Sequence, residues 1–254
     1  MNRIGIILCG GVGSRLGQIT KAIPKSLVPV YNKPLVDYQL ELFEFLGIRD
    51  IIIITRPDTY DLFTNYLLSD SNWSERFDNI KILEQKTPGG IAQAYQIVHN
   101  HIPEGANTLL GLGDNIFYFT SEYEKEELKH WCNSNTNFIT TITVKDPRPY
   151  GVVKFFDHSD IIEDVVEKPK DPPSNQIIPG LYFFDYTVFD KTKNLQPSSR
   201  GELEITDVQK LYINEGNLAA FKFKSVFWYD CGTVQDLLDA NNFMHIMEDK
   251  QCKV

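Results

Sequence analysis

The stretch IGIILCGGVGSRL at residues 4–16 decides the fold of this chain. Residues 4–9 form a short apolar run, which the glycines at positions 10 and 11 end. An apolar run without alternation is typical of a strand buried on both faces, as in a parallel sheet. Glycines directly after such a strand let the main chain approach a phosphate, with N–H groups pointing at the anion. We therefore expect a buried first strand and an anion-binding loop.

Strand and helix patterns alternate through the rest of the first half. The periodicity predicts strands at residues 51–54, 80–83 and 108–112, and helices at residues 35–46, 58–68 and 91–99. Their connections are short, which favours βαβ units and a mainly parallel sheet flanked by helices.

The second half is less regular and richer in strand patterns. We expect strands at residues 138–144, 152–156, 181–184 and 219–223, with a surface loop at residues 168–173. Thr233 is placed to cap a closing helix over residues 233–249. Its expected apolar stripe consists of Leu237, Leu238, Met244 and Met247. The chain is interpreted as one Rossmann-like α/β domain over residues 1–254 whose second half decorates the sheet.

Composition excludes several classes of protein. Among 254 residues, 42% are hydrophobic and 23% are charged, which is typical of a globular protein and not of a disordered or collagen-like chain. The longest apolar runs are far below the roughly 18 residues of a membrane helix. Cys9, Cys132, Cys231 and Cys252 contain no CxxC pair. Free thiols and a cytoplasmic location without membrane contact are therefore expected.

Charge is distributed unevenly. The net charge of −9 argues against nucleic acid as a partner, because phosphate neutralisation needs a basic face. Residues 1–36 nevertheless contain no Asp or Glu, where the average content would supply about five. Five basic residues lie there: Arg3, Arg15, Lys21, Lys25 and Lys33. This segment is either acid-free by chance, around an apolar strand, or built to attract an anion.

The glycine loop fits neither of two common phosphate motifs. A dinucleotide fingerprint needs a third glycine where Leu16 stands, and an acid after the second strand, where Thr55 and Arg56 stand. No register supplies the lysine of a Walker loop. A pattern GGxGxRL remains, followed by the segment PKSLVP at residues 24–29. Its glycines and the basic residues Arg15 and Lys25 favour phosphate binding.

These motifs resemble the N-terminal signature of sugar-phosphate nucleotidyltransferases. Later motifs in the same order resemble the glucose-1-phosphate thymidylyltransferases of that family and cover essentially the whole chain. They are PGGIAQA (88–94), LGDNIFY (112–118), PYGVV (149–153), EKP (167–169), GLYF (180–183), RGELEITD (200–207) and WYDCGT (228–233). The resemblance implies the nucleotide-diphospho-sugar transferase fold. It also implies a nucleotide-binding part at about residues 1–115 and an inserted β-rich sugar-binding part at about residues 116–232.

The resemblance implies in-line attack of a sugar phosphate on the α-phosphorus of a nucleoside triphosphate. Arg15 and Lys25 are the expected catalytic residues, and a planar Arg and a compact Lys suit charge neutralisation at phosphorus. The expected nucleotide-binding residues are Gly10, Gly11, Gly13, Arg15, Gln85 and Gly90.

Metal and sugar ligands follow from the same resemblance. Asp114 and Asp230 are expected to bind Mg²⁺, which commonly takes one or two carboxylates besides substrate phosphates. The expected sugar-phosphate-binding residues are Tyr150, Gly151, Glu167, Lys168 and Arg200. For Arg200, an alternative is that it only holds the chain around Glu202 and Glu204. Trp228 and Tyr229 are interpreted as core residues.

The chain departs from the family pattern at a few positions. Ser26 stands where a longer polar side chain, often Gln, is usual, so we expect an effect on nucleotide or sugar preference. Cys9 stands where Ala is usual. The longer bacterial enzymes continue for roughly 40 residues beyond the position of Val254, and weak or absent feedback inhibition is expected here.

The leading interpretation is an enzyme that makes dTDP-glucose from dTTP and glucose 1-phosphate. Alternatives are a UTP-preferring enzyme and an inactive sugar-nucleotide-binding subunit. The charged residues Arg15, Lys25, Asp114, Lys168 and Asp230 argue against the inactive subunit. A glycosyltransferase is disfavoured because no DxD motif stands at a strand end. The sequence leaves open whether the chain forms a homo-oligomer.

Overall fold

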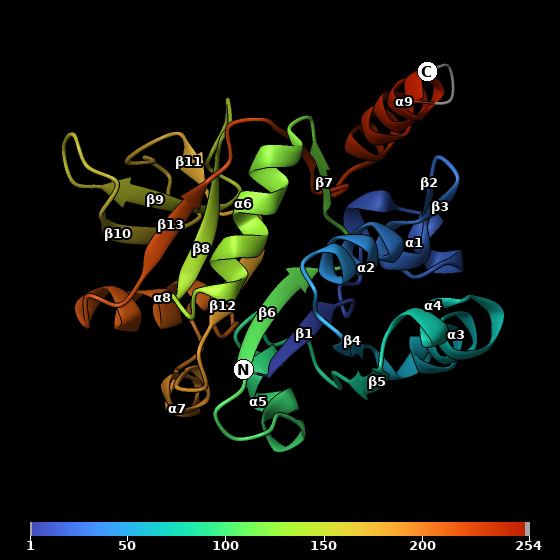
Figure 1. Cartoon of the computed structure of the whole chain (residues 1–254), viewed down its shortest axis with the longest axis horizontal. Coiled ribbons are helices and arrows are strands. Elements are labelled where there is room, and N and C mark those ends of the chain that lie inside the picture. Colours follow the sequence, from blue (N-terminus) through green and yellow to red (C-terminus); the bar gives the residue numbers. More distant parts are fainter. Residues whose placement is uncertain (1, 252–254) are drawn as a thin grey trace.

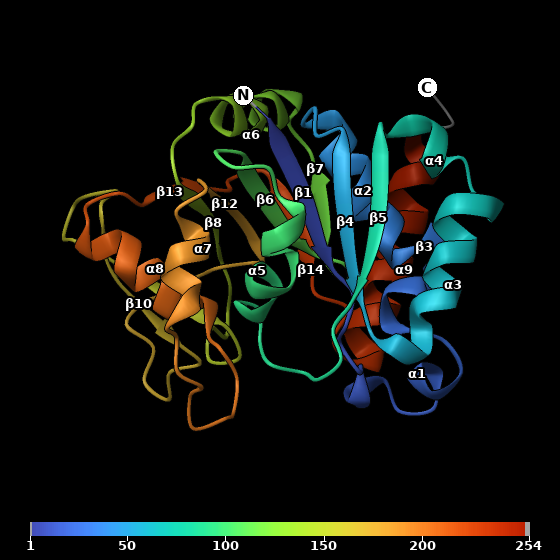
Figure 2. The same cartoon turned by 90° about the horizontal axis from the view of Figure 1, so that it is seen from below.

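The computed structural model describes residues 2–251. A ten-stranded mixed sheet forms the centre of the molecule (Figure 1). In its parallel half, four strands lie side by side in the order β6, β1, β4, β5 (Figure 2). Their bounds are β1 (Arg3–Leu8), β4 (Asp50–Thr55), β5 (Asn79–Glu84) and β6 (Asn107–Leu112). The buried first strand and the parallel βαβ arrangement are thereby confirmed.

The second half continues the same sheet. Strand β12 (Leu181–Phe184) is antiparallel to both β6 and β8 (Phe138–Thr143), so it joins the two halves. Beyond it lie β9 (Gly151–Phe155), β10 (Ile162–Glu167), β11 (Gln176–Ile177) and β13 (Ala219–Lys222). The four strands expected here are present, whereas β10 and β11 were not predicted. Two small sheets were also missed: β7 (Ile116–Phe119) with β14 (Val226–Tyr229), and β2 (Pro29–Val30) with β3 (Lys33–Pro34).

Helices cover both faces of the sheet. On one face, Tyr95, Phe184 and Tyr212 belong to a core beneath α5 (Gln93–Val98), α7 (Val188–Lys193) and α8 (Ile205–Asn214). On the other face, Phe43 and Phe63 belong to a second core. It lies beneath α2 (Leu35–Phe45), α3 (Tyr60–Asn65), α4 (Trp73–Arg76) and α6 (Glu122–Asn133). Side chains that point to opposite faces of each strand fill these two cores, which explains the continuous apolar runs.

The closing helix α9 (Val234–Gln251) packs beside the segment that follows the glycine loop. Thr233 caps it as expected, because Thr233 Oγ1 accepts a hydrogen bond from the main-chain N of Asp236 at 3.1 Å. The predicted stripe was wrong at Leu238, which is 52% exposed. Leu237 and Met244 are buried as predicted, and together with Ala240, which was not predicted, they pack against Leu16, Val28 and Tyr38.

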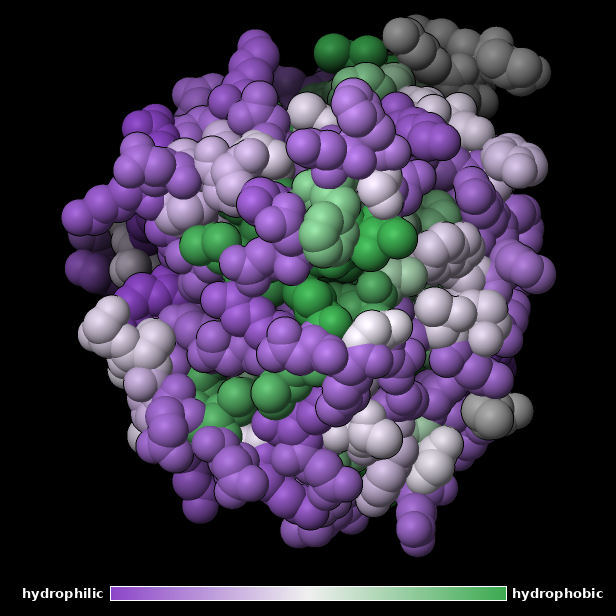
Figure 3. Space-filling view, turned by 90° about the vertical axis from the view of Figure 1, so that its left-hand side faces the viewer, coloured by the Kyte–Doolittle hydropathy of each residue, from purple (hydrophilic) through white to green (hydrophobic). Residues whose placement is uncertain are grey.

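The thiols of Cys9, Cys132 and Cys231 are free and buried, and Cys252 lies outside the described residues. Within residues 2–251, no helix is both long and apolar enough to span a bilayer. Figure 3 shows the face on the side of β9 and β10, where hydrophobic residues gather between hydrophilic ones. Two large hydrophobic side chains beside these strands are exposed, Phe156 and Ile161.

Candidate active site

Three chain segments with polar residues meet at the carboxyl ends of the parallel strands. The glycine loop follows β1, Gln85 follows β5, and Asp114 comes two residues after β6. Ligands bind at this edge in open α/β sheets, because the strand ends and the loops after them form a crevice there. In this structure the crevice contains two cavities with a shared border.

The first cavity, called here the glycine-loop cavity, has a volume of about 440 Å³. Its walls include the main chain of residues 10–15, Gln85 and the loop at residues 88–91. Every residue expected to bind nucleotide lines it: Gly10, Gly11, Gly13, Arg15, Gln85 and Gly90. Glycine at six wall positions leaves the main-chain groups accessible to a ligand.

The second cavity, called here the Tyr150 cavity, has a volume of about 210 Å³. Four of the five residues expected to bind sugar phosphate line it: Tyr150, Gly151, Glu167 and Lys168. Its wall also contains apolar surface from Ile178 and Tyr182. A mixed wall of carboxylate, ammonium, aromatic and apolar groups suits a polyhydroxylated ring with a charged substituent.

The two cavities share charged residues at their border. Arg15, Lys25, Asp114 and Lys168 line both of them, together with Ile91. Asp230 lines the Tyr150 cavity and Gly232 lines the glycine-loop cavity, so the segment after β14 also reaches this border. Anionic groups that entered from the two sides would therefore meet among three cations and two carboxylates.

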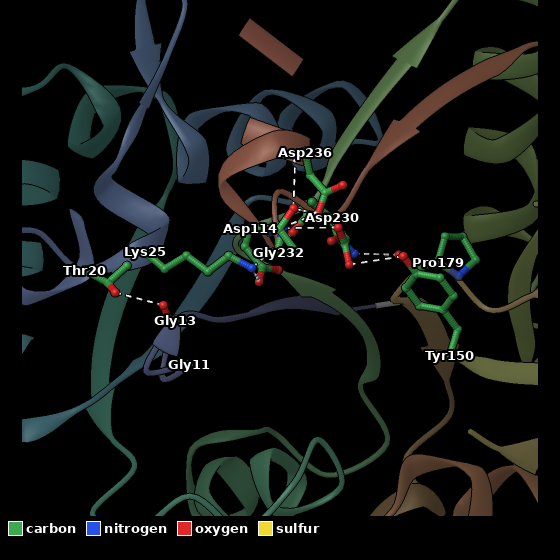
Figure 4. Close-up of polar contacts among 12 residues, drawn as sticks. Gly11, Gly13, Thr20, Lys25, Asp114, Tyr150, Pro179, Asp230, Gly232 and Asp236 are labelled. Atoms are coloured by element: carbon green, nitrogen blue, oxygen red, sulfur yellow. Dashed lines mark hydrogen bonds and ion pairs between the residues drawn. The ribbon is translucent and has the colours of Figure 1, made fainter. Parts of the chain in front are cut away.

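Lys25 contacts the carboxylate of Asp114 and the main chain of Asp230 at the border (Figure 4). Its Nζ lies 2.5 Å from Asp114 Oδ2 and donates to the main-chain O of Asp230 at 3.1 Å. The Lys25 side chain is only 8% exposed. A buried ammonium group with two oxygen partners is held in place, which is the arrangement that electrostatic catalysis requires.

Asp230 is held from two other directions. Its Oδ1 accepts from the main-chain N of Gly232 at 3.1 Å, and its Oδ2 accepts from the Tyr150 hydroxyl at 3.3 Å. Burial raises the pKa of this carboxyl, and the charge of Asp114 raises it further, while the Gly232 N–H and the Lys25 charge act in the opposite direction. Ionisation of Asp230 in the folded protein therefore costs free energy, as is typical of functional carboxylates.

Arg15 lies against the main chain of Gly232. A Cβ at position 232 would lie 2.7 Å from Arg15 Nη2 and 3.1 Å from Asp230 Oδ2. Only a residue without a side chain therefore leaves the guanidinium in this position at the border.

A buried amide network holds the turn that carries Asp114. Gln39 on α2 is fully buried, and its Nε2 donates to the main-chain O of Asn115 at 2.8 Å. Asn115 Nδ2 in turn donates to the main-chain O of Pro179 at 2.6 Å. Gly180, with φ of +86°, leaves room for this amide, since a Cβ there would lie 2.6 Å from Nδ2. The turn is thus fixed to α2 and to the start of β12.

Glu167 and Glu204 form a pair of carboxylates with Arg200 between them. Arg200 Nη2 lies 3.2 Å from Glu167 Oε1 and 2.7 Å from Glu204 Oε2. Burial raises the pKa of Glu167, and the like charge of Glu204 adds to this, while Lys168 and Arg200 lower it. Arg200 is the one expected site residue that lines neither cavity. Its guanidinium contacts carboxylates, including Glu202 at 3.2 Å.

The structure changes two further interpretations. Trp228 is not simply a core residue: it lines the Tyr150 cavity, and its Nε1 has no hydrogen-bond partner among the described residues. Tyr229 does pack against the core that contains Leu237. Ser26 is 3% exposed and lines neither cavity. Its side chain is hydrogen-bonded to the thiol of Cys9 instead. No contact of Ser26 with either cavity therefore supports the expected effect on substrate preference.

Several cavity residues were not assigned from the sequence. They include Asn115, Pro179, Thr206 and Trp228 in the Tyr150 cavity, and Glu202 in the glycine-loop cavity. Asn115 had a signal, because it stands beside Asp114 in the motif LGDNIFY. Thr206 and Glu202 lie in the motif RGELEITD, but no feature of that motif shows which of its side chains face a ligand.

Comparison with known proteins identifies the family. Residues 4–246 match the nucleotidyl transferase family. The chain is 41% identical over 249 residues to the glucose-1-phosphate thymidylyltransferase of Mycolicibacterium smegmatis, covering 97% of this chain and 84% of that protein. It is 39% identical over 253 residues to the enzyme of the same name from Xanthomonas campestris pv. campestris, covering 98% of this chain and 83% of that protein.

Solved structures agree. A Bacillus anthracis protein assigned as a glucose-1-phosphate thymidylyltransferase, solved with sucrose, superposes with a TM-score of 0.83. It is 34% identical, and the match covers 95% of this chain and 94% of that one. A UDP-glucose pyrophosphorylase with UDP-glucose has a TM-score of 0.85 over 97% of this chain and 100% of that one, but at 24% identity it supports the fold alone. The chain belongs to the nucleotidyl transferase family and, within it, to the glucose-1-phosphate thymidylyltransferases.

Proposed function

We propose that this enzyme forms dTDP-glucose and pyrophosphate from dTTP and glucose 1-phosphate. The observation that carries the proposal is the shared border, where Arg15, Lys25, Asp114 and Lys168 line both cavities. A phosphate oxygen of the sugar phosphate attacks the α-phosphorus. The bond from that phosphorus to the oxygen that bridges to the β-phosphorus breaks, and pyrophosphate leaves with its electron pair.

The glycine-loop cavity, which is lined mainly by residues 1–115, is assigned to the nucleotide. The main-chain N–H groups at Gly10, Gly11 and Gly13 are placed to bind phosphate oxygens. Arg15 carries positive charge at the border, where the β- and γ-phosphates would lie beside Gly232. Gln85 and Gly90 also line this cavity and are assigned to the base.

The Tyr150 cavity, which is lined mainly by residues 116–232, is assigned to the sugar phosphate. The Glu167 carboxylate is an acceptor for sugar hydroxyls, and Lys168, which lines both cavities, is a donor for the sugar's phosphate. Tyr150 and Gly151 form wall surface on the same side. Arg200 is assigned to this site through Glu167, to which its guanidinium is hydrogen-bonded.

Lys25 is the group best placed to stabilise the reacting α-phosphate. It lies at the border of the cavities, and its ammonium group is fixed by Asp114 and by the main chain of Asp230. As the phosphorus becomes five-coordinate, charge grows on its oxygens, and a fixed cation there stabilises the transition state more than the ground state. Holding both substrates in line lowers the barrier further.

Asp114 and Asp230 are assigned to Mg²⁺. Both carboxylates line the Tyr150 cavity at the border. They are close enough that the charge of Asp114 raises the pKa of Asp230. Among residues 2–251 no group of three or more His, Cys, Asp or Glu side chains could hold a metal ion. Mg²⁺ needs no such group, because it is usually held by one or two carboxylates together with substrate phosphates and water. When bound, it would neutralise charge on the phosphates.

The test is pyrophosphate release with Mg²⁺ and glucose 1-phosphate, comparing dTTP, UTP, CTP, ATP and GTP. Release with dTTP at a higher kcat/KM than with UTP is expected. A preference for UTP would change the nucleotide but leave the reaction class. Absence of release with all five, from folded protein and across several sugar 1-phosphates, would refute the proposal.

A further inference from the structure

The side-chain amide of Gln85 has a fixed orientation in the glycine-loop cavity. Its Nε2 donates to Oε1 of Gln93 at 2.7 Å. Its Oε1 points the other way, against the cavity wall at Gly10, where any Cβ would touch this oxygen. Within residues 2–251, no group donates a hydrogen bond to Gln85 Oε1. Gln85 is 7% exposed, so its amide has little other space to occupy.

Gln93 is itself held in place. It is the first residue of α5, and its amide packs against Gly89, where a Cβ would lie 2.5 Å from Cδ and Nε2 of Gln93 and 2.6 Å from its Oε1. The flanking main chain is paired with Leu203 on both sides. Leu203 N donates to Gly89 O at 2.8 Å, and Ala92 N donates to Leu203 O at 3.2 Å. The side chain of Gln93 is therefore confined beside Gly89, and its Oε1 is the atom that accepts the hydrogen bond from Gln85 Nε2.

The orientation of an amide matters because it carries an acceptor beside a donor. Turning a glutamine amide by half a turn exchanges the two. Thymine and uracil present a ring N–H donor beside the O4 acceptor, whereas cytosine presents a ring nitrogen acceptor beside the N4 amino donor. An amide that can turn freely matches either edge, and an amide held in one orientation matches only one of them.

We propose that Gln93 is a positioning residue that determines base specificity by holding the amide of Gln85 in one orientation. Gln85 Oε1 then accepts the N3–H of a thymine or uracil, and the second hydrogen of Gln85 Nε2 donates to O4. A cytosine would place acceptor against acceptor and donor against donor. This inference rests on the proposed function, because it assigns Gln85 to the base of the nucleoside triphosphate.

Three substitutions at position 93 separate this role from a general structural one. In Gln93→Glu, the carboxylate can only accept, so it keeps Gln85 Nε2 as its partner and holds the present orientation. In Gln93→Met, a side chain of similar size holds neither orientation. In Gln93→Lys, the ammonium group can only donate, so it favours the turned amide with Oε1 towards position 93.

The measurement is kcat/KM for pyrophosphate release with dUTP and with dCTP, at saturating glucose 1-phosphate. These two nucleotides share the deoxyribose and lack the thymine methyl, so their ratio reports the base edge. Charges introduced at position 93 act on both triphosphates alike and cancel in the ratio. Wild-type release with dTTP is measured first, because its absence would refute the proposed function and not the role of Gln93.

The wild-type enzyme is expected to prefer dUTP over dCTP by at least about a hundredfold, as sites built on hydrogen bonds reject mismatched groups strongly. Gln93→Glu should retain that ratio, Gln93→Met should lower it by about tenfold or more, and Gln93→Lys should lower it further. Equal use of dUTP and dCTP by an active wild-type enzyme would overturn the inference. So would a ratio that stays constant across the three variants, or one that falls equally in Gln93→Glu and Gln93→Lys.

Discussion

The ammonium group of Lys25 and the carboxylate of Asp114 meet at 2.5 Å, although the two residues are 89 positions apart. Lys25 lies in the segment after the glycine loop, and Asp114 follows β6. Nζ of Lys25 also contacts the main-chain O of Asp230, which follows β14. One cation thus joins three segments at the border of the two cavities, and this geometry gives the first prediction.

Lys25→Ala is expected to lower kcat by at least about a hundredfold, because it removes a fixed charge where the transition state gains charge. Steady-state pyrophosphate release measures the effect, and circular dichroism checks the fold. Lys33→Ala is the matched control, since Lys33 pairs with Glu41 outside both cavities of the active site. A folded Lys25→Ala enzyme with near-normal kcat would remove Lys25 from the chemistry.

Asp230→Asn is expected to separate activity from stability. Turnover should fall by at least about a hundredfold, because a neutral amide is a poor partner for a divalent cation. Burial raises the pKa of Asp230 in the folded state above its unfolded value. Its ionised form therefore costs folding free energy at pH values above the folded pKa, and the amide removes that cost. The Tm of the ligand-free variant at neutral pH should equal or exceed that of the wild type.

The two outcomes for Asp230 are judged separately. Asp239→Asn, at an exposed position of α9, serves as the control for losing one carboxylate. If Tm falls by many degrees together with activity, the main role of Asp230 is to hold the chain through Gly232 and Tyr150.

Glu167 gives the enzyme an acid limit that depends on a neighbouring carboxylate. Burial, and then the charge of Glu204, hold the pKa of Glu167 above its ordinary value. Only the ionised form is an acceptor for sugar hydroxyls, so KM for glucose 1-phosphate should rise as pH falls through this raised pKa. Glu204→Gln removes the like charge and should move that rise to lower pH.

The pH profile is measured as KM for glucose 1-phosphate in wild type and in Glu204→Gln, with KM for dTTP as the internal reference. Glu202→Gln is the matched control, because Glu202 also contacts Arg200 and is not among the groups that raise the pKa of Glu167. A Glu204→Gln profile that coincides with the wild-type profile would contradict the coupling of the two carboxyls.

Much of the site could be predicted because its residues stand in continuous motifs. Gly10, Gly13 and Arg15 follow a strand whose apolar pattern is unmistakable, and the carboxyl ends of parallel strands share one edge. Asp114 was located by the same argument. For residues in such positions, local pattern and fold class together determine where the side chain lies.

The remaining features depend on contacts between distant segments, which a local pattern does not contain. The Gln39–Asn115 hydrogen bond joins residues 76 positions apart, and the Arg200–Glu167 contact joins residues 33 apart. Trp228 was interpreted as core, because it stands in an apolar and aromatic run before Asp230. Trp228 lies on β14, whose pairing with β7 was missed, and it lines the Tyr150 cavity. The prediction that Leu238 is buried was wrong for a related reason, because the buried face of a helix depends on which distant segments pack against it.

Gly232→Ala is expected to act through Arg15. The main chain at Gly232 does not have a positive φ, so alanine is acceptable to the backbone. Its Cβ, however, would lie 2.7 Å from Arg15 Nη2 and would displace the guanidinium. KM for dTTP should rise by about tenfold, because the displaced charge no longer faces the triphosphate.

A double-mutant cycle tests that route. Arg15→Ala alone should raise KM for dTTP, and adding Gly232→Ala should then have little further effect, since the group it displaces is already absent. Additive effects of the two substitutions would show that Gly232→Ala acts on something other than Arg15, with Asp230 as the next neighbour.

Cys9 and Ser26, two departures from the family pattern, contact each other. Both are buried, and Gly113 packs on them, since a Cβ at Gly113 would lie 3.1 Å from Ser26 Oγ and would also contact Cys9 Sγ. Burial raises the pKa of the Cys9 thiol to about 12, so the thiol stays neutral, and the Ser26 side chain is hydrogen-bonded to it.

Ser26→Gln would overpack this contact and destabilise the protein by about 1–3 kcal/mol in urea unfolding. Cys9→Ala should relieve much of that loss in the double variant, whereas Cys9→Ala alone leaves a small cavity and should destabilise slightly. The dTTP:UTP selectivity of the Ser26→Gln variant should remain within about threefold of wild type if the Gln side chain stays in this buried contact and out of the cavities. A large change in selectivity with unchanged stability would place position 26 at the nucleotide after all.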